Sequence, residues 1–190
     1  MDIMEIVTSI LICIWVFIPA MVPNSTAVIC GGGTPVDFGK TLKGKRILGD
    51  GKTWRGLIGG TLSGVILGLL MIGLSSLFGS TDYWGFGPFW DNVGILFCLS
   101  FGALFGDMLG SFIKRRLDIG RGKKAPLLDQ YDFVFGSFLI TTIFYPNWVY
   151  STFIAGTNWI GLIVMLVLVW FIHRSVSILG YKMGLKNEPW

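Results

Sequence analysis

The sequence has few of the residues that soluble enzymes use most for catalysis and metal binding. Among 190 residues there are one histidine and three cysteines, and Asp, Glu, Lys and Arg together make up only 14%. The cysteines (Cys13, Cys30 and Cys98) lie singly in or beside apolar segments, without the paired spacing of a zinc site or a disulfide framework. Neither Gly-Lys-Thr triplet, at 39–41 or 51–53, has the upstream glycine that a nucleoside-triphosphate P-loop requires. We therefore expect no zinc site, no disulfide framework and no nucleoside-triphosphate P-loop.

Long apolar runs are what the chain has in abundance. Hydrophobic residues make up 53% and the mean hydropathy is +0.69, which is typical of an integral membrane protein. Each of five runs is close to the roughly 20 residues that a membrane-spanning helix needs. We expect residues 1–190 to form one all-α transmembrane domain, with five helices at about 3–23, 55–79, 92–113, 132–153 and 158–178. The connections at about 30–54 and 114–131 are expected to be cytoplasmic loops.

The basic residues are confined to segments that five spans would place on one side of the membrane. All 15 Lys and Arg fall in the first loop, the third loop or the C-terminal segment, whereas the other side carries only Asp2, Glu5, Asp82 and Asp91. The positive-inside rule assigns the basic side to the cytoplasm. The pattern predicts a multi-pass cell-membrane protein with its N-terminus outside and its C-terminus inside. The basic loops could simply set this orientation and contact anionic lipid headgroups.

Proline and glycine mark two local features of the apolar runs. Pro19 and Pro23, followed by Asn24-Ser25-Thr26, predict that the first helix is interrupted near its cytoplasmic end, because proline removes a backbone donor. A plain kink and a polar lining from Asn24 and Ser25 both remain open. In the second run, glycine at every fourth position predicts close helix packing: Gly56, Gly60, Gly64 and Gly68.

A carboxylate inside the third apolar run is the strongest functional signal. An ionisable side chain at membrane depth costs roughly 2.5–3.5 kcal/mol on insertion scales and usually faces a polar cavity, so Asp107 is a candidate site residue. Helical periodicity places Asp107, Ser111 and either Lys114 or Arg115 along one face. This face therefore combines an acid, a hydroxyl and basic groups.

A second pair of carboxylates, Asp129 and Asp132, lies where the next apolar helix begins. If the third and fourth spans pack antiparallel, Asp107 and Asp129 can converge on one point. Two or three carboxylates around a point suit Mg²⁺, which takes its other ligands from water and phosphates. The sequence alone thus predicts a membrane enzyme that handles phosphates with a divalent metal.

Simpler roles remain open for each of these carboxylates. Asp129 and Asp132 could merely stabilise the positive end of their helix. Asp107 could form a buried ion pair with a basic residue of its own helix. Asp118, in the third loop, could be an exposed residue that balances neighbouring arginines.

Two sequence motifs, and the order in which they occur, resemble those of the CDP-diglyceride synthetases. These are membrane cytidylyltransferases that activate lipid phosphates with CTP. One is the run 44–56, and the other is Gly106-Asp107-x-x-x-Ser111-x-x-Lys114-Arg115 followed by Pro126 and Asp129-x-x-Asp132. The segments 23–27 and 31–39 are more similar to the archaeal branch of that family, the CDP-archaeol synthases, and the resemblance covers about 15–140. The Pro-Gly-His-Gly-Gly turn of bacterial members is absent, and Gln130 stands where an arginine is expected.

The resemblance implies a reaction and its cofactor. CMP would pass from CTP to an isoprenoid glycerol ether phosphate, 2,3-di-O-geranylgeranylglycerol 1-phosphate, with release of pyrophosphate. Mg²⁺ would be the cofactor, and a second, monovalent cation is left open. The partners would be CTP from the cytoplasm and a lipid held in the bilayer, with no nucleic acid, and the oligomeric state is left open.

The resemblance also implies roles for individual residues. Asp107 and Asp129 would be the Mg²⁺ ligands, and Asp132 a further ligand or a group that orients one. Lys52, Lys114 and Arg115 would neutralise phosphates, and Ser111 and Asn24 would donate hydrogen bonds. The wider substrate-binding set comprises Ser25, Lys45, Arg46, Asp50, Thr53 and Arg55.

A non-catalytic membrane protein is the alternative, either a small transporter for an anionic solute or a protein that binds anionic lipid. Asp107 would then relay protons or gate a pathway. No inverted repeat is visible to support a transporter. A CDP-alcohol phosphatidyltransferase is disfavoured because its Asp-Gly-x-x-Ala-Arg block is absent.

Overall fold

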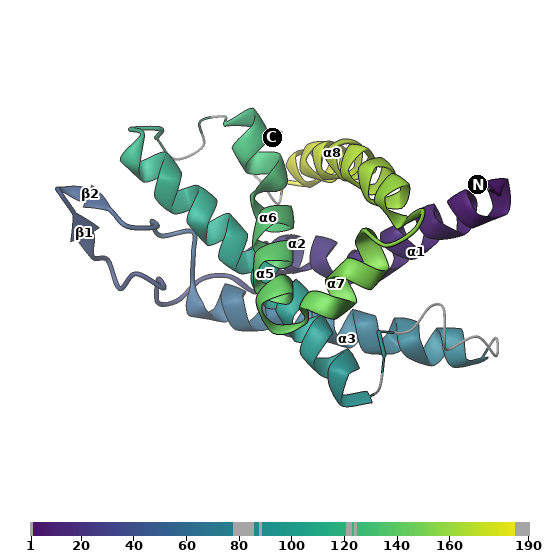
Figure 1. Ribbon diagram of the computed structural model, residues 1–190. Helices are drawn as coiled ribbons and strands as arrows, with labels where there is room; N and C mark the ends of the chain where they lie inside the picture. The colour runs from purple at the N-terminus through teal and green to yellow at the C-terminus, as the bar shows by residue number, and fades with distance from the viewer. Residues whose placement is uncertain (1, 78–85, 88, 121–122, 124, 185–190) are drawn as a thin grey trace.

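The computed structural model describes residues 2–77, 86, 87, 89–120, 123 and 125–184; Asp82 therefore lies outside the described residues. Figure 1 shows a bundle of helices from which a short hairpin projects, at the end remote from the start of α1. The helices are α1 (Ile3–Met21), α2 (Pro23–Cys30), α3 (Trp54–Leu77), α5 (Phe89–Arg116), α6 (Pro126–Phe144), α7 (Pro146–Phe153) and α8 (Asn158–Lys182). The hairpin pairs β1 (Thr41–Leu42) with β2 (Lys45–Arg46) in antiparallel register.

Four candidate membrane spans are found among the described residues: Ile3–Cys30, Trp54–Leu77, Trp90–Arg116 and Asn158–Lys182. The predicted helix over 132–153 is wrong as a single helix, because the chain forms α6 and α7 with a break at Tyr145. Pro146 explains the break. It has no N–H and disfavours helical backbone in the preceding residue, and Tyr145 has φ −133° and ψ 56°.

The predicted third loop, 114–131, is also shorter than expected. α5 continues to Arg116 and α6 begins at Pro126, so the connection between them spans 117–125. Basic residues in the last turn of α5 stabilise its negative end, and proline is favoured in the first turn of a helix. As a result Lys114, Arg115 and Asp129 stand on helices and not in a loop.

The predicted interruption of the first helix is confirmed, since α1 ends at Met21 and α2 begins at Pro23. Pro23 has no N–H to donate to the carbonyl of Pro19 one turn earlier. The Ser100 hydroxyl of α5 donates to that carbonyl oxygen instead, at 3.4 Å. The interruption is therefore stabilised by a neighbouring helix.

The glycine stripe of α3 lies against α1, α2 and α5, as predicted. A Cβ at Gly64 would collide with Ser100 and with the Pro19 carbonyl, and a Cβ at Gly68 would collide with Leu96. The same kind of contact joins α5 to α6. A Cβ at Gly136 would strike the backbone of Gly102, so these two helices cross backbone to backbone.

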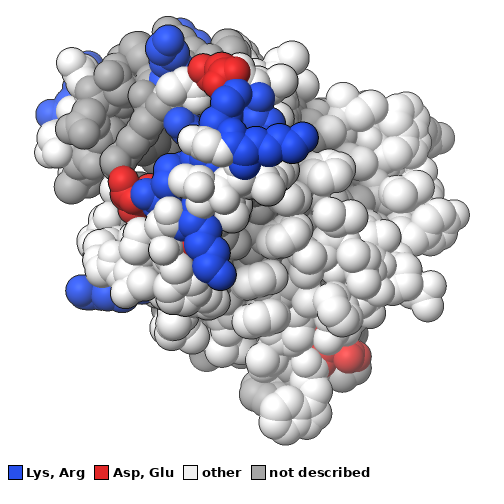
Figure 2. All heavy atoms as spheres, turned by 90° about the vertical axis from the view of Figure 1, so that its left-hand side faces the viewer, with Lys and Arg blue, Asp and Glu red and all other residues white. Residues whose placement is uncertain are grey.

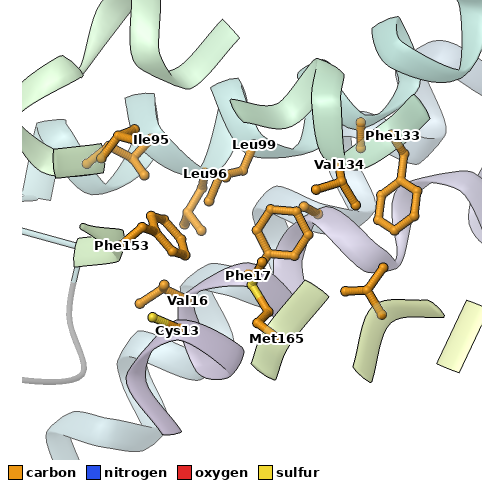
Figure 3. Packing of buried hydrophobic residues seen from close by; sticks show 14 of the residues in the cluster. Cys13, Val16, Phe17, Ile95, Leu96, Leu99, Phe133, Val134, Phe153 and Met165 are labelled. Carbon is orange, nitrogen blue, oxygen red and sulfur yellow. The ribbon is translucent and has the colours of Figure 1, made fainter. Parts of the chain in front are cut away.

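The apolar core is arranged around α1, which contacts α3, α5, α6, α7 and α8. Figure 3 shows Phe17 of α1 between residues of α5, α6 and α8. Its ring stacks on Phe138, with the centroids 5.4 Å apart, and meets Phe153 edge-on at 6.5 Å. Large apolar side chains such as Ile3, Leu70 and Phe135 are exposed on the outside, as expected of helices that face lipid.

Charged side chains gather at the hairpin end of the molecule. Figure 2 looks onto that end, which lies at the left of Figure 1, and shows Lys and Arg concentrated in part of it beside broad uncharged surface. The hairpin turn itself, Lys43-Gly44, has φ of 52° and 75°, the backbone of a two-residue type I′ turn. Its strands lead into the glycine-rich segment that carries the candidate site.

Candidate active site

The segment 31–53, between α2 and α3, is organised around the carboxylate of Asp37. This side chain is 1% exposed and accepts hydrogen bonds from the backbone N–H groups of Gly39 (3.0 Å), Leu48 (2.9 Å) and Gly49 (3.0 Å). The Arg46 guanidinium donates at 2.8 Å. Burial alone would raise the pKa of Asp37, but the bonds from Arg46 and the three N–H groups outweigh it and lower the pKa well below its usual value.

The hairpin is attached to the end of α5 by Arg116. Its guanidinium donates to the carbonyl oxygens of Leu42 (2.7 Å), Lys45 (3.2 Å) and Arg46 (2.8 Å). Lys45 also forms an ion pair with Asp118 at 2.5 Å, and Asp118 is 76% exposed. The exposed position predicted for Asp118 is confirmed, although its partner is Lys45. Lys45, a predicted substrate ligand, is thus held through its carbonyl by Arg116 of α5 and through its ammonium by Asp118, just beyond that helix.

Two lysine–aspartate pairs join three parts of the chain. Lys52, at the end of the glycine-rich segment, pairs with Asp107 of α5, and both side chains are about one-quarter exposed. Lys114 of α5 pairs with Asp129 of α6 at 2.5 Å, and Asp129 also accepts the backbone N–H of Ala125 at 2.8 Å. Asp107 is therefore half of an ion pair, but its partner comes from the loop and not from its own helix.

Asp132 lies where α6 packs most closely on α5. It is 8% exposed, and a Cβ at Gly110 would collide with its carboxylate. Its Oδ1 accepts the N–H of Phe133 at 2.7 Å. Gly110 is three residues after Asp107 and four before Lys114, so Asp132 lies beside the face of α5 that carries both. We call Lys52, Asp107, Lys114 and Asp132 the charged cluster. Asp129 joins it through Lys114.

Two cavities with charged lining residues meet at Lys52. The inner cavity, of about 60 Å³, lies between α2, α3 and α5, and its mixed lining combines Lys52 and Asp107 with apolar residues such as Leu104. Asn24 and Thr53 also line it. The outer cavity, of about 310 Å³, is lined by the loop and the end of α5, including Arg46, Asp50, Lys52, Ser111, Lys114 and Arg115. The outer cavity thus has four cationic side chains and one carboxylate, which suits a polyanionic ligand.

The remaining predicted residues have different surroundings. The hydroxyl of Thr53 accepts the N–H of Gly56 at 3.2 Å and so caps the start of α3. Arg55 is exposed, and its aliphatic stem lies over Gly33. Ser25 is exposed on α2 and lines a third, apolar cavity, to which Asn24 also contributes.

Comparison with known proteins identifies the family. A family model described as CarS-like, CDP-archaeol synthase, matches residues 4–190. The CDP-archaeol synthase of Methanoregula boonei is 48% identical over 174 residues, which cover 91% of this chain and 99% of the relative. That of Picrophilus torridus is 45% identical over 188 residues, covering 95% and 97%. This chain belongs to the CDP-archaeol synthase family.

A solved structure agrees with this assignment of the fold. It is described as an intramembrane enzyme for archaeal membrane lipid biosynthesis, superposes with a TM-score of 0.64 at 35% identity, and covers 87% of this chain and 92% of its own. The resemblance to the CDP-archaeol synthases is therefore confirmed, as is the prediction of a membrane enzyme of the lipid-phosphate cytidylyltransferase type. The non-catalytic alternative is not supported.

A CDP-archaeol synthase is expected to use a divalent metal, and the donors at this site can be compared with that expectation. Among the described residues, no three His, Cys, Asp or Glu side chains form a group that could hold a metal ion. Asp107 and Asp129 instead each hold a lysine ammonium. Carboxylate oxygens are of the ligand type that Mg²⁺ takes, usually one or two of them together with substrate phosphates and water. Asp107 and Asp129 are therefore suitable in chemical type for a metal that also binds a phosphate ligand, and the assignment of Mg²⁺ to them stays a prediction.

Two residues that shape the site of this CDP-archaeol synthase family member were missed from the sequence. Neither Asp37 nor Arg116 was predicted to be a site residue, yet Asp37 organises the loop and Arg116 attaches it to α5. A local signal existed for Asp37, because an aspartate two residues before Gly39 is typical of an Asx turn. No local signal points to Arg116, since its carbonyl partners are about 70 residues away.

Proposed function

We propose that this protein transfers CMP from CTP to the phosphate of an isoprenoid glycerol ether, 2,3-di-O-geranylgeranylglycerol 1-phosphate. The products are the CDP-activated lipid and pyrophosphate. One observation carries the proposal: Lys52 lines the cationic outer cavity and also pairs with Asp107, a carboxylate within the helix bundle. Family membership supports the same reaction.

The step itself is a displacement at phosphorus. An oxygen of the lipid phosphate attacks the α-phosphorus of CTP, and the bond from that phosphorus to the α–β bridging oxygen breaks. Pyrophosphate leaves with the electron pair. The nucleophile is already an anion, so no general base is needed, in keeping with a site of lysines, arginines and aspartates. Catalysis then depends on positioning and on neutralising the charge of the leaving group.

The outer cavity is the proposed triphosphate site. Arg46, Lys52, Lys114 and Arg115 would neutralise the phosphates, and the Ser111 hydroxyl would donate a hydrogen bond. The Nε of Arg115 is buried without a hydrogen-bond partner among the described residues. A buried donor of this kind is costly unless a ligand supplies an acceptor, which supports a phosphate oxygen as its partner.

Mg²⁺ is the proposed cofactor. Asp107, Asp129 and Asp132 would hold it, and when bound it supplies positive charge next to the phosphates. Lys52 and Lys114 pair with two of these acids in the described structure. Both lysines also line the outer cavity, so their ammonium groups can turn to phosphate oxygens while the carboxylates hold the cation.

The orientation in the membrane is part of the proposal. The chain would cross five times, with α6 and α7 together forming the fourth crossing, and the site would face the cytoplasm. Two observations support this: the hairpin, to which Arg116 is hydrogen-bonded, lies at one end of the bundle, where Lys and Arg gather, and the first residues of α1 lie at the other. CTP would then reach the outer cavity directly.

Purified protein supplied with CTP labelled at the α-phosphorus tests the reaction. We expect label to enter lipid with the ether-linked phosphate as acceptor, to do so far less with an ester-linked one, and to stop when EDTA removes Mg²⁺. Absence of labelled lipid with every acceptor would overturn the proposal. Equal rates with both acceptors would overturn only the assignment of the lipid.

A further inference from the structure

Two aromatic side chains are exposed side by side at the start of α3. Phe38, in the glycine-rich segment, is 63% exposed, and Trp54, the first residue of α3, is 40% exposed. Their ring centroids are 6.2 Å apart, with an angle of 45° between the ring planes. Neither residue lines the outer or the inner cavity. The pair therefore forms an apolar patch on the outside of the molecule that the proposed triphosphate site does not account for.

The backbone holds Phe38 in this exposed position. Its φ of 50° lies in the left-handed region, which is uncommon and unfavourable for a bulky side chain. Its N–H donates to the carbonyl oxygen of Pro35 at 3.0 Å, and the N–H of Gly39 donates to the Asp37 carboxylate at 3.0 Å. A conformation that is unfavourable for the residue, yet held by its neighbours, points to a role for the exposed ring.

Trp54 sets the level of the pair relative to the membrane. It is the first residue of the candidate span Trp54–Leu77, and tryptophan is enriched where spans meet the headgroup region. The ring of Phe38 lies beside it and so at a similar level. Two exposed basic residues are close in the chain, since Lys40 is two residues after Phe38 and Arg55 follows Trp54. Neither forms an ion pair with a carboxylate of the described residues. Aromatic rings flanked by such cations are complementary to an anionic membrane surface.

We propose that Phe38 and Trp54 anchor the glycine-rich segment at the membrane surface. The two rings lie at the headgroup boundary, and Lys40 and Arg55 contact anionic lipid headgroups. The partner is the anionic surface of the bilayer and not the lipid substrate. Arg55, which was predicted to bind substrate, lines neither the outer nor the inner cavity, in keeping with this role. The lipid contact itself does not depend on the proposed function.

The anchor is joined to Lys52 by backbone pairing. The N–H of Val36 donates to the carbonyl oxygen of Lys52 at 2.8 Å, and the N–H of Trp54 donates to that of Thr34 at 3.1 Å. These bonds pair 34–36 with 52–54 in antiparallel register. The anchor therefore fixes the depth of Lys52 relative to the bilayer. This second part rests on the proposed function, because it takes Lys52 to meet the phosphate of a lipid that stays in the membrane.

Photo-cross-linking tests the anchor without relying on turnover. A phenylalanine analogue with a diazirine on its ring replaces Phe38, and the protein is reconstituted in vesicles of mixed anionic and zwitterionic lipid. The same analogue at Lys43, exposed in the hairpin turn, is the control. We expect lipid adducts at 38, enriched in the anionic lipid, and water adducts at 43. Lys40→Gln should lower the enrichment about fivefold, the scale of one basic side chain at an anionic surface.

Three results would overturn the anchor. Water adducts at 38 would place the ring outside the bilayer. Lipid adducts without enrichment of the anionic lipid, or with enrichment that Lys40→Gln leaves unchanged, would remove the basic residues from the contact. Lipid adducts that disappear when CTP is added would show that the ring contacts the nucleotide instead.

CMP transfer in the same vesicles tests the link to Lys52. Phe38→Asn removes the ring, and asparagine tolerates left-handed backbone, so the fold of the segment should be kept. We expect several-fold slower transfer with KM for CTP unchanged, whereas Phe38→Trp, which keeps an aromatic ring, should match wild type. Leu42→Thr is the control, since Leu42 is an exposed apolar residue of the hairpin. Full activity of Phe38→Asn would overturn the link to Lys52. If wild type transfers no CMP, the proposed function fails and the cross-links alone decide the anchor.

Discussion

Lys52 is the residue that links the polar parts of the site. Its ammonium pairs with Asp107 and borders both the inner and the outer cavity. Removing one partner of such a half-buried pair would leave the other charge uncompensated, which is costly. Without substrate, Lys52 therefore orients Asp107 through this ion pair. With substrate, the same lysine can exchange its carboxylate for a phosphate oxygen.

The first prediction concerns Asp107 itself. Asp107→Asn preserves side-chain shape but removes the charge that pairs with Lys52 and that would hold Mg²⁺. We expect CMP transfer to fall below detection while the protein still inserts and elutes as a single species. Incorporation of labelled CTP and size-exclusion chromatography measure the two properties. Asp118→Asn is the control, since its exposed ion pair is worth at most about 1 kcal/mol. Full Mg²⁺-dependent activity of Asp107→Asn would contradict the assignment.

The second prediction uses a glycine that sets the position of Asp132. A Cβ at Gly110 would collide with the Asp132 carboxylate, whereas a Cβ at Gly73 of α3 meets no atom within 4 Å. Gly110→Ala should force Asp132 away from α5 and cost about 1–3 kcal/mol, the usual penalty of overpacking, with a large loss of activity. Gly73→Ala should be neutral or stabilising, because alanine favours helix by about 1 kcal/mol. Thermal unfolding and CMP-transfer assays distinguish Gly110→Ala from Gly73→Ala. Equal stability and equal activity of the two variants would show that Gly110 does not set the position of Asp132.

Among the elements, the β1–β2 hairpin depends most on contacts from outside itself. Two residues per strand give little stability on their own. Arg116 of α5 donates three hydrogen bonds to the hairpin, and the Asp37 carboxylate accepts one from the Arg46 side chain of β2. Because Arg46 lines the outer cavity while bonded to Asp37, loosening the hairpin should disturb the proposed triphosphate site.

The third prediction separates the geometry of Arg116 from its charge. Arg116→Lys keeps the positive charge but cannot reach three carbonyl oxygens at once. We expect faster proteolysis within 40–46 and a higher KM for CTP, with kcat less affected. Arg174→Lys on α8 is the control, since Arg174 lies 5.9 Å from the centre of the Trp170 ring. It should change neither the rate of proteolysis within 40–46 nor KM for CTP. If Arg116→Lys behaves as wild type, charge alone accounts for the role of Arg116.

The fourth prediction follows from the lowered pKa of Asp37. A carboxyl group whose pKa is depressed in the folded protein contributes stability above its unfolded pKa, near 3.9. That contribution is lost as the pH falls through the folded value. Protection of the hairpin against an acid-tolerant protease should therefore stay constant from neutral pH down to about 4.5. Asp37→Asn should lose the protection at every pH. Loss of wild-type protection between pH 7 and 5 would exclude Asp37 as its source.

Most helices could be predicted from the sequence, and the exceptions have local causes. Predicted spans at 3–23, 55–79 and 158–178 correspond to α1, α3 and α8 because each apolar run ends at polar or proline residues. The break at Pro146 was missed because the run around it has the length of a full span. Asp107 was found from the cost of a charge in an apolar segment, and Asp129 and Asp132 from their place where the next apolar helix begins, but the partners of these carboxylates were not found. Lys52 and Asp107 are 55 residues apart, and only the crossing of the loop over α5 brings them together.

Across the whole molecule, three cavities follow one another from charged to apolar surroundings. The outer cavity shares Lys52 with the inner one, and the inner one shares Asn24 with the apolar cavity. An amphiphile with a phosphate at one end likewise runs from a charged part to an apolar part. The charge distribution agrees, since basic side chains gather at the hairpin end and exposed apolar side chains cover the long helices. This order supports the proposed reaction, in which a water-soluble nucleotide meets a lipid that stays in the membrane.

The last prediction tests the direction in which the bundle crosses the membrane. Thr41, at the start of the hairpin, and Met4, in the first turn of α1, are both exposed and lie at opposite ends of the bundle. With Cys30 replaced by alanine, and with Cys13 and Cys98 buried, a new cysteine at either position reports its side of the membrane. A membrane-impermeant maleimide should label Met4→Cys in intact cells and Thr41→Cys only after permeabilisation, because the positive-inside rule places the basic end in the cytoplasm. The reverse pattern would put the hairpin and the charged cluster outside, where cytoplasmic CTP could not reach them.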